Sequence, residues 1–326
     1  MHEIKTGIIG ASKVAEEYVK IAKLRNNSLN LIGIVGRKSL KSKRLAAKYK
    51  IKYSSNNINE LLKFNLDLII VAVDIASTIN VAKKLKDFKG FILFEKPLGK
   101  NYIETKKIVK FLYKNKLNCY VALNRRSYQN VEMVYKEIKK DNSKKFLSIY
   151  DQQDLKIVKK AGHKFKILQN WMYANSVHLI DLLVFMAQSK PVKITSEKIN
   201  LQKGYLINSK VIFKNGNIGY YNAIWNRPGP WSLNISTSMT HYEFSPLETL
   251  KVRSSLNLRK KTIYIEKTKY KPGFLRQINN LIKIFNLKKT NKSINNLGKN
   301  KNFNIIPNIE EYLKLSLIIK KIYKNV

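Results

Sequence analysis

Short apolar runs of strand length alternate with segments of helical spacing along the first 123 residues. Ala15, Val19 and Ala22 share one face of such a helical segment. The expected strands are 4–10, 29–35, 66–73, 91–94 and 118–123, and the expected helices are 15–24, 39–49, 57–63, 76–85 and 102–114. Strands that alternate with helices through short loops are typical of a parallel sheet with right-handed crossovers. We therefore predict an α/β, doubly wound domain over residues 1–123.

The pattern changes after residue 124. A helix expected at 130–140 is followed by strands expected at 146–151, 193–200, 205–213, 218–225 and 232–237, with a hairpin turn at Lys214–Asn217. The nearly all-apolar stretch 176–187 predicts a helix buried in this part of the chain. These elements indicate a second, α+β domain over residues 124–326 with a large, mostly antiparallel sheet. We expect an exposed Lys/Asn-rich loop at 287–304 and an amphipathic closing helix at 309–323, which can pack back on the first domain.

Length and cysteine content change this picture little. At 326 residues the chain has enough length for two cores, since single cores stop growing at roughly 250–300 residues. A single cysteine, Cys119, excludes an internal disulfide and a cysteine-based zinc site, so we expect no metal centre. Cys119 is expected to be buried in a strand. Without a secretion signal or a spanning apolar segment, the sequence indicates a cytoplasmic protein with no membrane role.

The formal net charge of +42 raises the question of nucleic-acid binding. Only nine of the 63 basic residues are arginines, and the lysines are spread over nearly every segment of the chain. Lysine also accompanies abundant Asn and Ile, which is typical of a protein from an AT-rich genome. We therefore expect no specific nucleic-acid partner, although polyanions should bind nonspecifically at low salt.

A candidate phosphate-binding turn lies directly after the first expected strand. The residues Gly10-Ala11-Ser12-Lys13-Val14-Ala15 stand where a G-x-G-x-x-G/A dinucleotide fingerprint belongs. Gly10 permits the tight turn, Ala15 permits close helix–strand packing, and Ser12 replaces the second glycine with a hydroxyl donor for a phosphate oxygen. The first backbone N–H groups of the helix would hold the pyrophosphate. The alternative is a β-turn-α connection that binds nothing.

The end of the second strand bears on the choice of cofactor. NAD enzymes keep an acidic residue there for the ribose 2′-hydroxyl, whereas this chain has Val35-Gly36-Arg37-Lys38-Ser39. Arg37, Lys38 and Ser39 could bind a 2′-phosphate through charge-assisted hydrogen bonds. The sequence therefore predicts a Rossmann site that prefers NADP(H), with NAD(H) as the possible alternative.

Two groups are candidates for proton transfer. Lys96, in Glu95-Lys96-Pro97, ends a strand at the carboxyl edge of the sheet, where ligands of such folds bind. His178 and Asp181 are three residues apart on one face of the apolar helix, and a neutral histidine could accept a proton from an alcohol. The alternatives are a solvated strand-end lysine and a core histidine paired with Asp181.

Six segments together resemble the glucose-fructose oxidoreductase and inositol dehydrogenase (Gfo/Idh/MocA) family. They are GIIGASKVA at 7–15, ILFEKPLG at 92–99, ALNRR at 122–126, NSVHLID at 175–181, FKNGNIG at 213–219 and KPGF at 271–274. The resemblance implies a Rossmann domain, an open-faced sheet that forms a homodimer or homotetramer, and NAD(P)-dependent redox chemistry on a sugar, sugar acid, cyclitol or nucleotide sugar. It also implies that Lys96 and His178 act at the substrate hydroxyl, and that the Lys96–Pro97 bond is cis.

One family position differs. The catalytic aspartate that stands four residues before the histidine is Ala174 here, and the adjacent Asn175 can hydrogen-bond a hydroxyl but cannot exchange a proton. Asn175 could equally be the N-cap of the buried helix. The missing aspartate leaves open a second function, a cofactor-binding protein that has lost catalysis and serves as a sensor or assembly partner.

The expected sites comprise the following residues. The cofactor contacts are Gly10, Ser12, Lys13, Val14, Arg37, Lys38, Val73, Glu95, Lys96 and Asn124, and the substrate contacts are Lys96, Arg126, Trp171, Asn175 and His178. Trp225 and Trp231 are expected to pack on the sheet or at a subunit contact rather than against a sugar.

Overall fold

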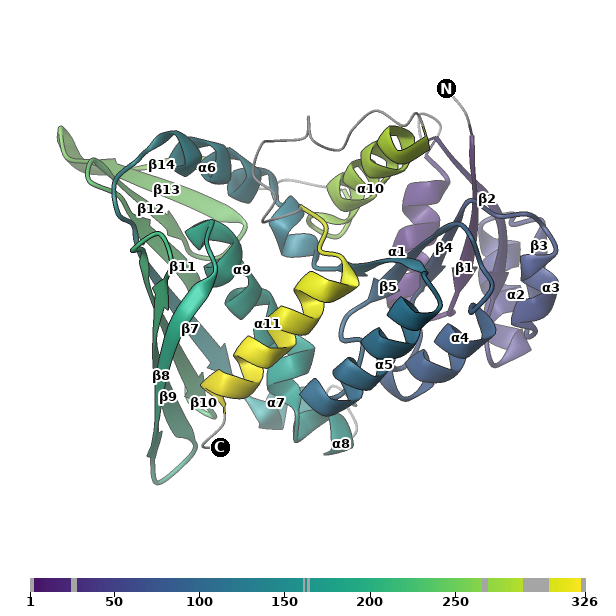
Figure 1. The fold of residues 1–326 in the computed structure, drawn as a ribbon, viewed down its shortest axis with the longest axis horizontal. Helices are drawn as coiled ribbons and strands as arrows, with labels where there is room; N and C mark the ends of the chain where they lie inside the picture. The colour runs from purple at the N-terminus through teal and green to yellow at the C-terminus, as the bar shows by residue number, and fades with distance from the viewer. Residues whose placement is uncertain are drawn as a thin grey trace. The chain divides into compact units, whose positions relative to one another are not determined.

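The computed structural model describes residues 3–24, 28–160, 162, 165–265, 269–289 and 305–323. The chain divides into two compact units (Figure 1). Unit 1 comprises residues 1–124, 269–299 and 304–313, and unit 2 comprises residues 125–268, 300–303 and 314–326.

Unit 1 contains a six-stranded parallel sheet with strand order β3-β2-β1-β4-β5-β6. The strands are β1 Ile4–Ile9, β2 Leu29–Val35, β3 Tyr53–Ser55, β4 Leu68–Val71, β5 Phe91–Glu95 and β6 Asn118–Ala122. The connecting helices are α1 Lys13–Ala22, α2 Ser39–Lys48, α3 Ile58–Leu62, α4 Thr78–Lys84 and α5 Tyr102–Lys114. This order is that of a doubly wound Rossmann sheet, which confirms the predicted fold class. The three-residue β3 was not predicted.

The core of unit 1 uses a helix from late in the sequence. Alternate residues of each strand point to opposite faces of the sheet. On one face they pack with α1, α2 and α10 (Phe274–Lys289), whose Phe274 ring lies 5.0 Å from the ring of Tyr18. Helix α10 was not predicted, and the loop expected at 287–304 begins inside it; residues 290–304 of that loop lie outside the described residues.

Unit 2 contains an eight-stranded sheet with strand order β14-β13-β12-β11-β7-β10-β9-β8. All neighbouring strands are antiparallel except β7 and β10, which are parallel. The strands are β7 Phe146–Gln153, β8 Pro191–Asn200, β9 Tyr205–Phe213, β10 Ile218–Trp225, β11 Trp231–Ser236, β12 Thr240–Phe244, β13 Thr249–Ser254 and β14 Asn257–Ile265. This confirms the predicted mostly antiparallel sheet, although β12, β13 and β14 were not predicted.

The helices of unit 2 include the one expected at 176–187. They are α6 Gln129–Lys140, α7 Leu155–Lys160, α8 Phe165–Leu168 and α9 Val177–Ala187, and α11 Ile309–Ile322 contributes residues to both units. Every residue of α9 is buried, and the helix packs on β7, β10 and β11. Along β10, residues that face α9 are buried and alternate with half-buried residues on the other face. One face of the sheet is therefore core, and the other is partly open.

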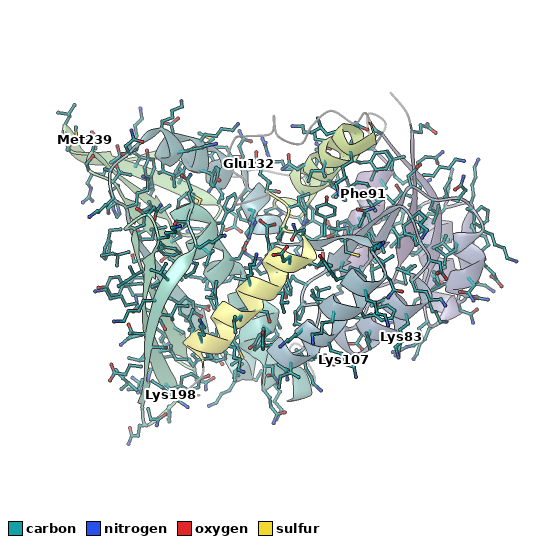
Figure 2. All side chains as sticks on the ribbon, viewed as in Figure 1. Lys83, Phe91, Lys107, Glu132, Lys198 and Met239 are labelled. Atoms are coloured by element: carbon teal, nitrogen blue, oxygen red, sulfur yellow. The ribbon has the colours of Figure 1, made fainter. Side chains whose placement is uncertain are left out.

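Charged residues are spread over both units. Figure 2 labels Lys83 on α4, Lys107 on α5 and Lys198 on β8. Lys198 lies over the ring of Tyr205, with 4.7 Å between Nζ and the ring centroid. No helix in the described part of the chain is long and apolar enough to cross a membrane.

Candidate functional site

The turn between β1 and α1 brings three backbone segments close together. Gly10 has φ +129°, and a Cβ at this position would lie 2.1 Å from the carbonyl oxygen of Ala72 at the end of β4. Ser12 is the N-cap of α1; its Oγ accepts a hydrogen bond from the Ala15 N–H (3.2 Å) and donates one to the Ala72 carbonyl (3.5 Å). The hydroxyl predicted to reach a phosphate therefore caps the helix and leaves the first backbone N–H groups of α1 as anion donors.

A cavity of about 630 Å³ opens at this turn. Five predicted cofactor residues line it: Gly10, Ser12, Arg37, Lys38 and Val73. Six further polar residues line it that sequence reasoning missed: Lys41, Asn56, Asp74, Ser77, Asn80 and Lys84. Most of them belong to segments that follow β2, β3 and β4. The carboxyl ends of neighbouring parallel strands meet at one sheet edge, and that signal could have identified them.

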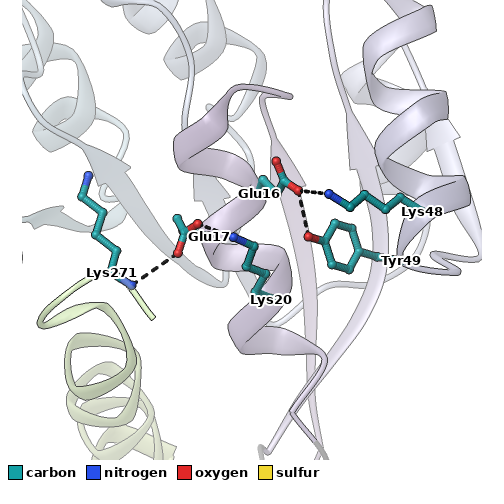
Figure 3. A network of polar contacts seen from close by, with 6 residues as sticks. All are labelled: Glu16, Glu17, Lys20, Lys48, Tyr49 and Lys271. Atoms are coloured by element: carbon teal, nitrogen blue, oxygen red, sulfur yellow. Dashed lines mark hydrogen bonds and ion pairs between the residues drawn. The ribbon is translucent and has the colours of Figure 1, made fainter. Parts of the chain in front are cut away.

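A second cavity, of about 410 Å³, lies beside α1. Two of the predicted cofactor contacts, Lys13 and Val14, line it. Lys20, Lys269 and Lys271 also line it, together with Glu17. Glu17 pairs with Lys20 (2.6 Å) and accepts a hydrogen bond from the backbone N–H of Lys271 (3.4 Å), as Figure 3 shows. The carboxylate joins α1 to the segment that leads into α10.

The adjacent Glu16 ties α1 to α2. Its Oε1 accepts hydrogen bonds from Lys48 Nζ (2.7 Å) and from the Tyr49 hydroxyl (2.8 Å) (Figure 3). These two contacts lower the pKa of Glu16, the lysine having the larger effect. These contacts join α1 to the C-terminal end of α2.

Glu95-Lys96-Pro97 follows β5 with the expected cis bond between Lys96 and Pro97. Glu95 Oε1 accepts a hydrogen bond from the Tyr18 hydroxyl (2.5 Å), and Oε2 accepts one from the Lys96 backbone N–H (3.2 Å). Burial raises the pKa of Glu95, while the Tyr18 hydroxyl and the charge of Lys96 oppose that rise. Glu95 thus anchors the backbone that carries the half-buried Lys96.

Asn124 is buried at the end of unit 1, where its Nδ2 donates to the carbonyl of Pro272 (2.9 Å). This bond links the segment after β6 to the KPGF segment. Glu95, Lys96 and Asn124 are not among the residues that line these two cavities.

His178 lies buried in the first turn of α9, and Asp181 follows on the same face. The carboxylate of Asp181 pairs with Arg126: Nη2 lies 2.5 Å from Oδ1, and Nε lies 2.8 Å from Oδ2. Burial raises the pKa of Asp181, and the guanidinium opposes that rise. The structure therefore places Arg126, a predicted substrate contact, in a buried ion pair. Arg126 is 3% exposed and Asp181 is 1% exposed.

Trp171 and Asn175, two further predicted substrate contacts, donate to the same acceptor. Trp171 Nε1 and Asn175 Nδ2 lie 2.7 and 3.1 Å from Oε1 of Gln153. Asn175 lies in a π-helical turn, Met172–Ser176, that runs into α9, and the residue at the N-cap position of α9 is Ser176 in helical conformation. The N-cap interpretation of Asn175 is wrong because the helical backbone continues past it.

Gln153 also connects this turn to a buried carboxylate. Its Nε2 donates to Asp151, which accepts further hydrogen bonds from Trp231 Nε1 (2.7 Å) and the Tyr221 hydroxyl (2.5 Å). Burial raises the pKa of Asp151, and these donors oppose the rise. Trp225 is fully buried and stacks on Tyr205 at 5.3 Å, in agreement with the packing role expected for it. Trp231 is half-buried at the start of β11, and its indole N–H donates to Asp151.

Residues 4–123 match the model of the oxidoreductase family with an NAD-binding Rossmann fold, GFO_IDH_MocA. No curated protein matches the sequence. Among the described residues, no group of three or more His, Cys, Asp or Glu side chains is arranged to hold a metal ion.

Solved structures share the fold over the whole chain. UDP-N-acetylglucosamine 3-dehydrogenase GnnA from Acidithiobacillus ferrooxidans is 12% identical, with a TM-score of 0.75 over 100% of this chain and 98% of that one. The dehydrogenase MviM from Clostridium difficile is 19% identical, with a TM-score of 0.72 over 99% of both chains. A super-repressor mutant of Gal80p from Saccharomyces cerevisiae is 14% identical, with a TM-score of 0.78 over 99% of this chain and 95% of that one.

Proposed function

Because residues 4–123 match the model of the Gfo/Idh/MocA oxidoreductase family, we propose that the protein transfers hydride between a nicotinamide cofactor and a carbohydrate. The substrate class is a sugar, sugar acid, cyclitol or nucleotide sugar. The observation that carries the proposal is the turn at Gly10, where only glycine fits against Ala72 and where α1 begins at a 630 Å³ cavity. A dinucleotide requires this close backbone approach, a helix N-terminus and a cavity together.

We propose that the cofactor is NADP(H), with NAD(H) bound more weakly. Arg37, Lys38 and Lys41 line the cavity at the end of β2, whereas the carboxylate in its lining, Asp74, follows β4. A 2′-phosphate beside the three cationic groups would form charge-assisted hydrogen bonds, worth roughly 1.5–3 kcal/mol each. A 2′-hydroxyl would gain much less from the same side chains.

Titration with NADPH and NADH at physiological salt tests this preference. Arg37→Ala should weaken NADPH binding by roughly tenfold or more and change NADH binding little. Arg44→Ala is the matched control, because Arg44 is exposed on α2 and does not line the cavity. Equal affinity for both cofactors, unchanged by Arg37→Ala, would show that the preference is wrong. Binding of neither cofactor would contradict the oxidoreductase proposal itself.

We propose that Lys96 and His178 share proton transfer at the substrate hydroxyl. When bound, the nicotinamide supplies the hydride acceptor or donor. Glu95 fixes the backbone at Lys96 through its Lys96 N–H contact, and the π-helical turn held by Gln153 precedes His178. We propose that Trp171 and Asn175 position the substrate. Arg126 is excluded from this role because its guanidinium is bonded to Asp181 of α9.

Lys96→Ala and His178→Ala test this assignment. Each variant should lose at least roughly 100-fold in turnover, since general acid–base groups contribute 10²–10⁴-fold. NADPH affinity and the melting temperature serve as controls for cofactor binding and folding. If turnover is unchanged in both variants, Lys96 and His178 do not transfer the proton.

The second candidate is a cofactor-binding protein without catalysis. Ala174 stands, 7% exposed, where the family resemblance implies a catalytic aspartate, and a super-repressor mutant of Gal80p shares the fold. This function predicts saturable NADPH binding, with no turnover of uronates, cyclitols or nucleotide sugars by the wild-type protein. Turnover of any of them favours the enzyme.

We further propose a cytoplasmic homodimer or homotetramer formed through the partly open face of the eight-stranded sheet. Phe146 and Tyr150 of β7 are 48% and 39% exposed on that face, and Phe146 lies 5.4 Å from the ring of Tyr220. Phe146→Glu should shift the protein towards the monomer in sedimentation velocity. A wild-type protein that sediments as a monomer would contradict this proposal.

A further inference from the structure

Two consecutive arginines, Arg125 and Arg126, begin unit 2 and have different surroundings. Arg126 holds Asp181 through Nε and Nη2. The side chain of Arg125 makes no ion pair or hydrogen bond with any described residue, and its Nε is sealed from solvent without a hydrogen-bond partner. The residue as a whole is half-buried, and of its guanidinium nitrogens only Nε is both sealed and unpartnered. A planar cation with its donors unused contrasts with the paired guanidinium beside it.

Packing fixes the plane of Arg125. Its Cζ lies 4.6 Å from the centroid of the Trp231 ring, a cation–π distance. Trp231 is itself held by the bond from its Nε1 to Asp151 (2.7 Å). The guanidinium is therefore preorganised on an immobile aromatic face, unlike a long surface side chain that samples many rotamers.

The nearby acidic groups are occupied elsewhere. Glu248 accepts a hydrogen bond from the Tyr128 hydroxyl (3.1 Å), and Asp151 accepts bonds from Gln153, Trp231 and Tyr221. Tyr128, Glu248 and Asp151 act on Arg125 only through space; they oppose the lowering of its pKa by burial. Because an arginine stays protonated in a protein, Arg125 is a half-buried cation to which no carboxylate of the described residues is directly bonded.

Arg125 is also connected to the residues around His178. The next residue, Arg126, is bonded to Asp181, one turn after His178 on α9. Trp231 and Asp151 lead through Gln153 to Asn175, three residues before His178. Two separate chains of contacts within unit 2 thus join Arg125 to both sides of His178.

We propose that the Nη edge of Arg125 binds an oxyanion of the substrate, a carboxylate or a phosphate. The inference rests on the proposed function. Among its substrate classes it favours those that carry an oxyanion, which are sugar acids, nucleotide sugars and sugars that bear a phosphate. It disfavours neutral sugars and cyclitols. Two parallel N–H groups match two oxygens of a carboxylate or phosphate, and a partly desolvated site strengthens the bond. Arg126 cannot serve instead because Asp181 occupies it.

Matched probes test the proposal by binding alone. D-glucuronate and glucose 6-phosphate represent the two sources of oxyanion, and D-glucose is the neutral comparator. Each is titrated at roughly 150 mM salt, where the Debye length of about 8 Å suppresses the diffuse attraction of a basic protein. Calorimetry gives the affinity, and tryptophan emission reports on Trp231 at the site.

The expected result is tighter binding of at least one oxyanion than of glucose, and a roughly 10- to 100-fold loss of that binding in Arg125→Gln. Arg253→Gln, which removes an exposed arginine of β13 in the same unit, should leave the affinity unchanged. Arg125→Lys should recover only part of the loss because it keeps the charge without the planar pair of donors. The preferred probe identifies carboxylate or phosphate as the source.

Three outcomes would overturn the proposal: no probe binds the wild-type protein, glucose binds as tightly as the oxyanions, or Arg125→Gln binds them as the wild type does. The melting temperature and NADPH affinity of Arg125→Gln show whether the variant is folded. If Arg125→Gln does not fold, Arg125→Lys carries the test, and undiminished oxyanion binding overturns the proposal. Failure of NADPH to bind would contradict the proposed function and leave this binding result standing.

Discussion

The ion pair between Arg126 and Asp181 allows a quantitative test of how α9 is held. Both residues are nearly inaccessible, three N–O contacts of 2.5–3.1 Å join them, and the guanidinium also lies 4.9 Å from the ring of Phe185. Asp181→Leu leaves a buried cation that cannot lose its proton. We expect it to reduce the free energy of unfolding of unit 2 by about 3–5 kcal/mol.

Arg126→Met has a smaller and pH-dependent effect, because the carboxyl left behind can take up a proton. Keeping a carboxyl with an ordinary pKa of 3.8 protonated at pH 7 costs at most about 4 kcal/mol. In this variant the folded-state pKa of Asp181 is raised above its unfolded value. Its destabilisation is therefore largest at neutral pH and is lost as the pH falls towards 4.

The double variant Arg126→Met/Asp181→Leu removes both charges and should lie within about 1 kcal/mol of the wild type, since an apolar pair can replace a buried ion pair. All three tryptophans, Trp171, Trp225 and Trp231, belong to unit 2, so urea unfolding followed by tryptophan emission reports on the unit that contains the pair. Single losses below about 1 kcal/mol, or losses that add in the double variant, would refute this reasoning.

Three further predictions concern unit 1. Gly10→Ala should abolish NADPH binding, because its Cβ would lie 2.1 Å from the Ala72 oxygen at φ +129°; saturable binding by a folded variant would contradict this. Glu16→Gln should lower the free energy of unfolding by about 0.5–1 kcal/mol at pH 7. The pKa of Glu16 is lowered from 4.5 by Lys48, so its contribution is complete above that value and the difference should vanish as the pH falls below it; a difference that persists at pH 2 in urea titrations would contradict the pairing. Burial raises the pKa of the Cys119 thiol to about 12, so a disulfide reagent at pH 8 should modify it only after unfolding, and rapid modification of the native protein would be the contrary result.

The order of elements in unit 1 could be predicted because its signals are local. Each strand and helix there has its own apolar period, and helix α5 was expected at its observed bounds. Strand β3 has three residues, all half-buried, and therefore too short a pattern to identify. Strands β12 and β13 carry mixed half-buried faces, which weakens the alternation of polar and apolar positions on which the prediction depends.

Contacts between distant segments of the sequence could not be predicted. The spacing of His178 and Asp181 identified their shared helix face, but the partner of Asp181 is 55 residues away in Arg126. Asn175 was predicted to contact the substrate. Its acceptor, Gln153, lies 22 residues earlier on β7, and no local pattern marks it.

The position of α10 late in the sequence has a consequence for folding during synthesis on the ribosome. Phe274 and Phe285 pack against Tyr18 and Phe91, so the first sheet is completed by side chains made about 150 residues after residue 124. At bacterial or eukaryotic elongation speeds this delay lasts roughly 10–30 s. Throughout this delay, the part of the sheet face that α10 covers is exposed to water, where chaperones can bind it. A polypeptide released early, after residue 124, would keep that face exposed and should aggregate.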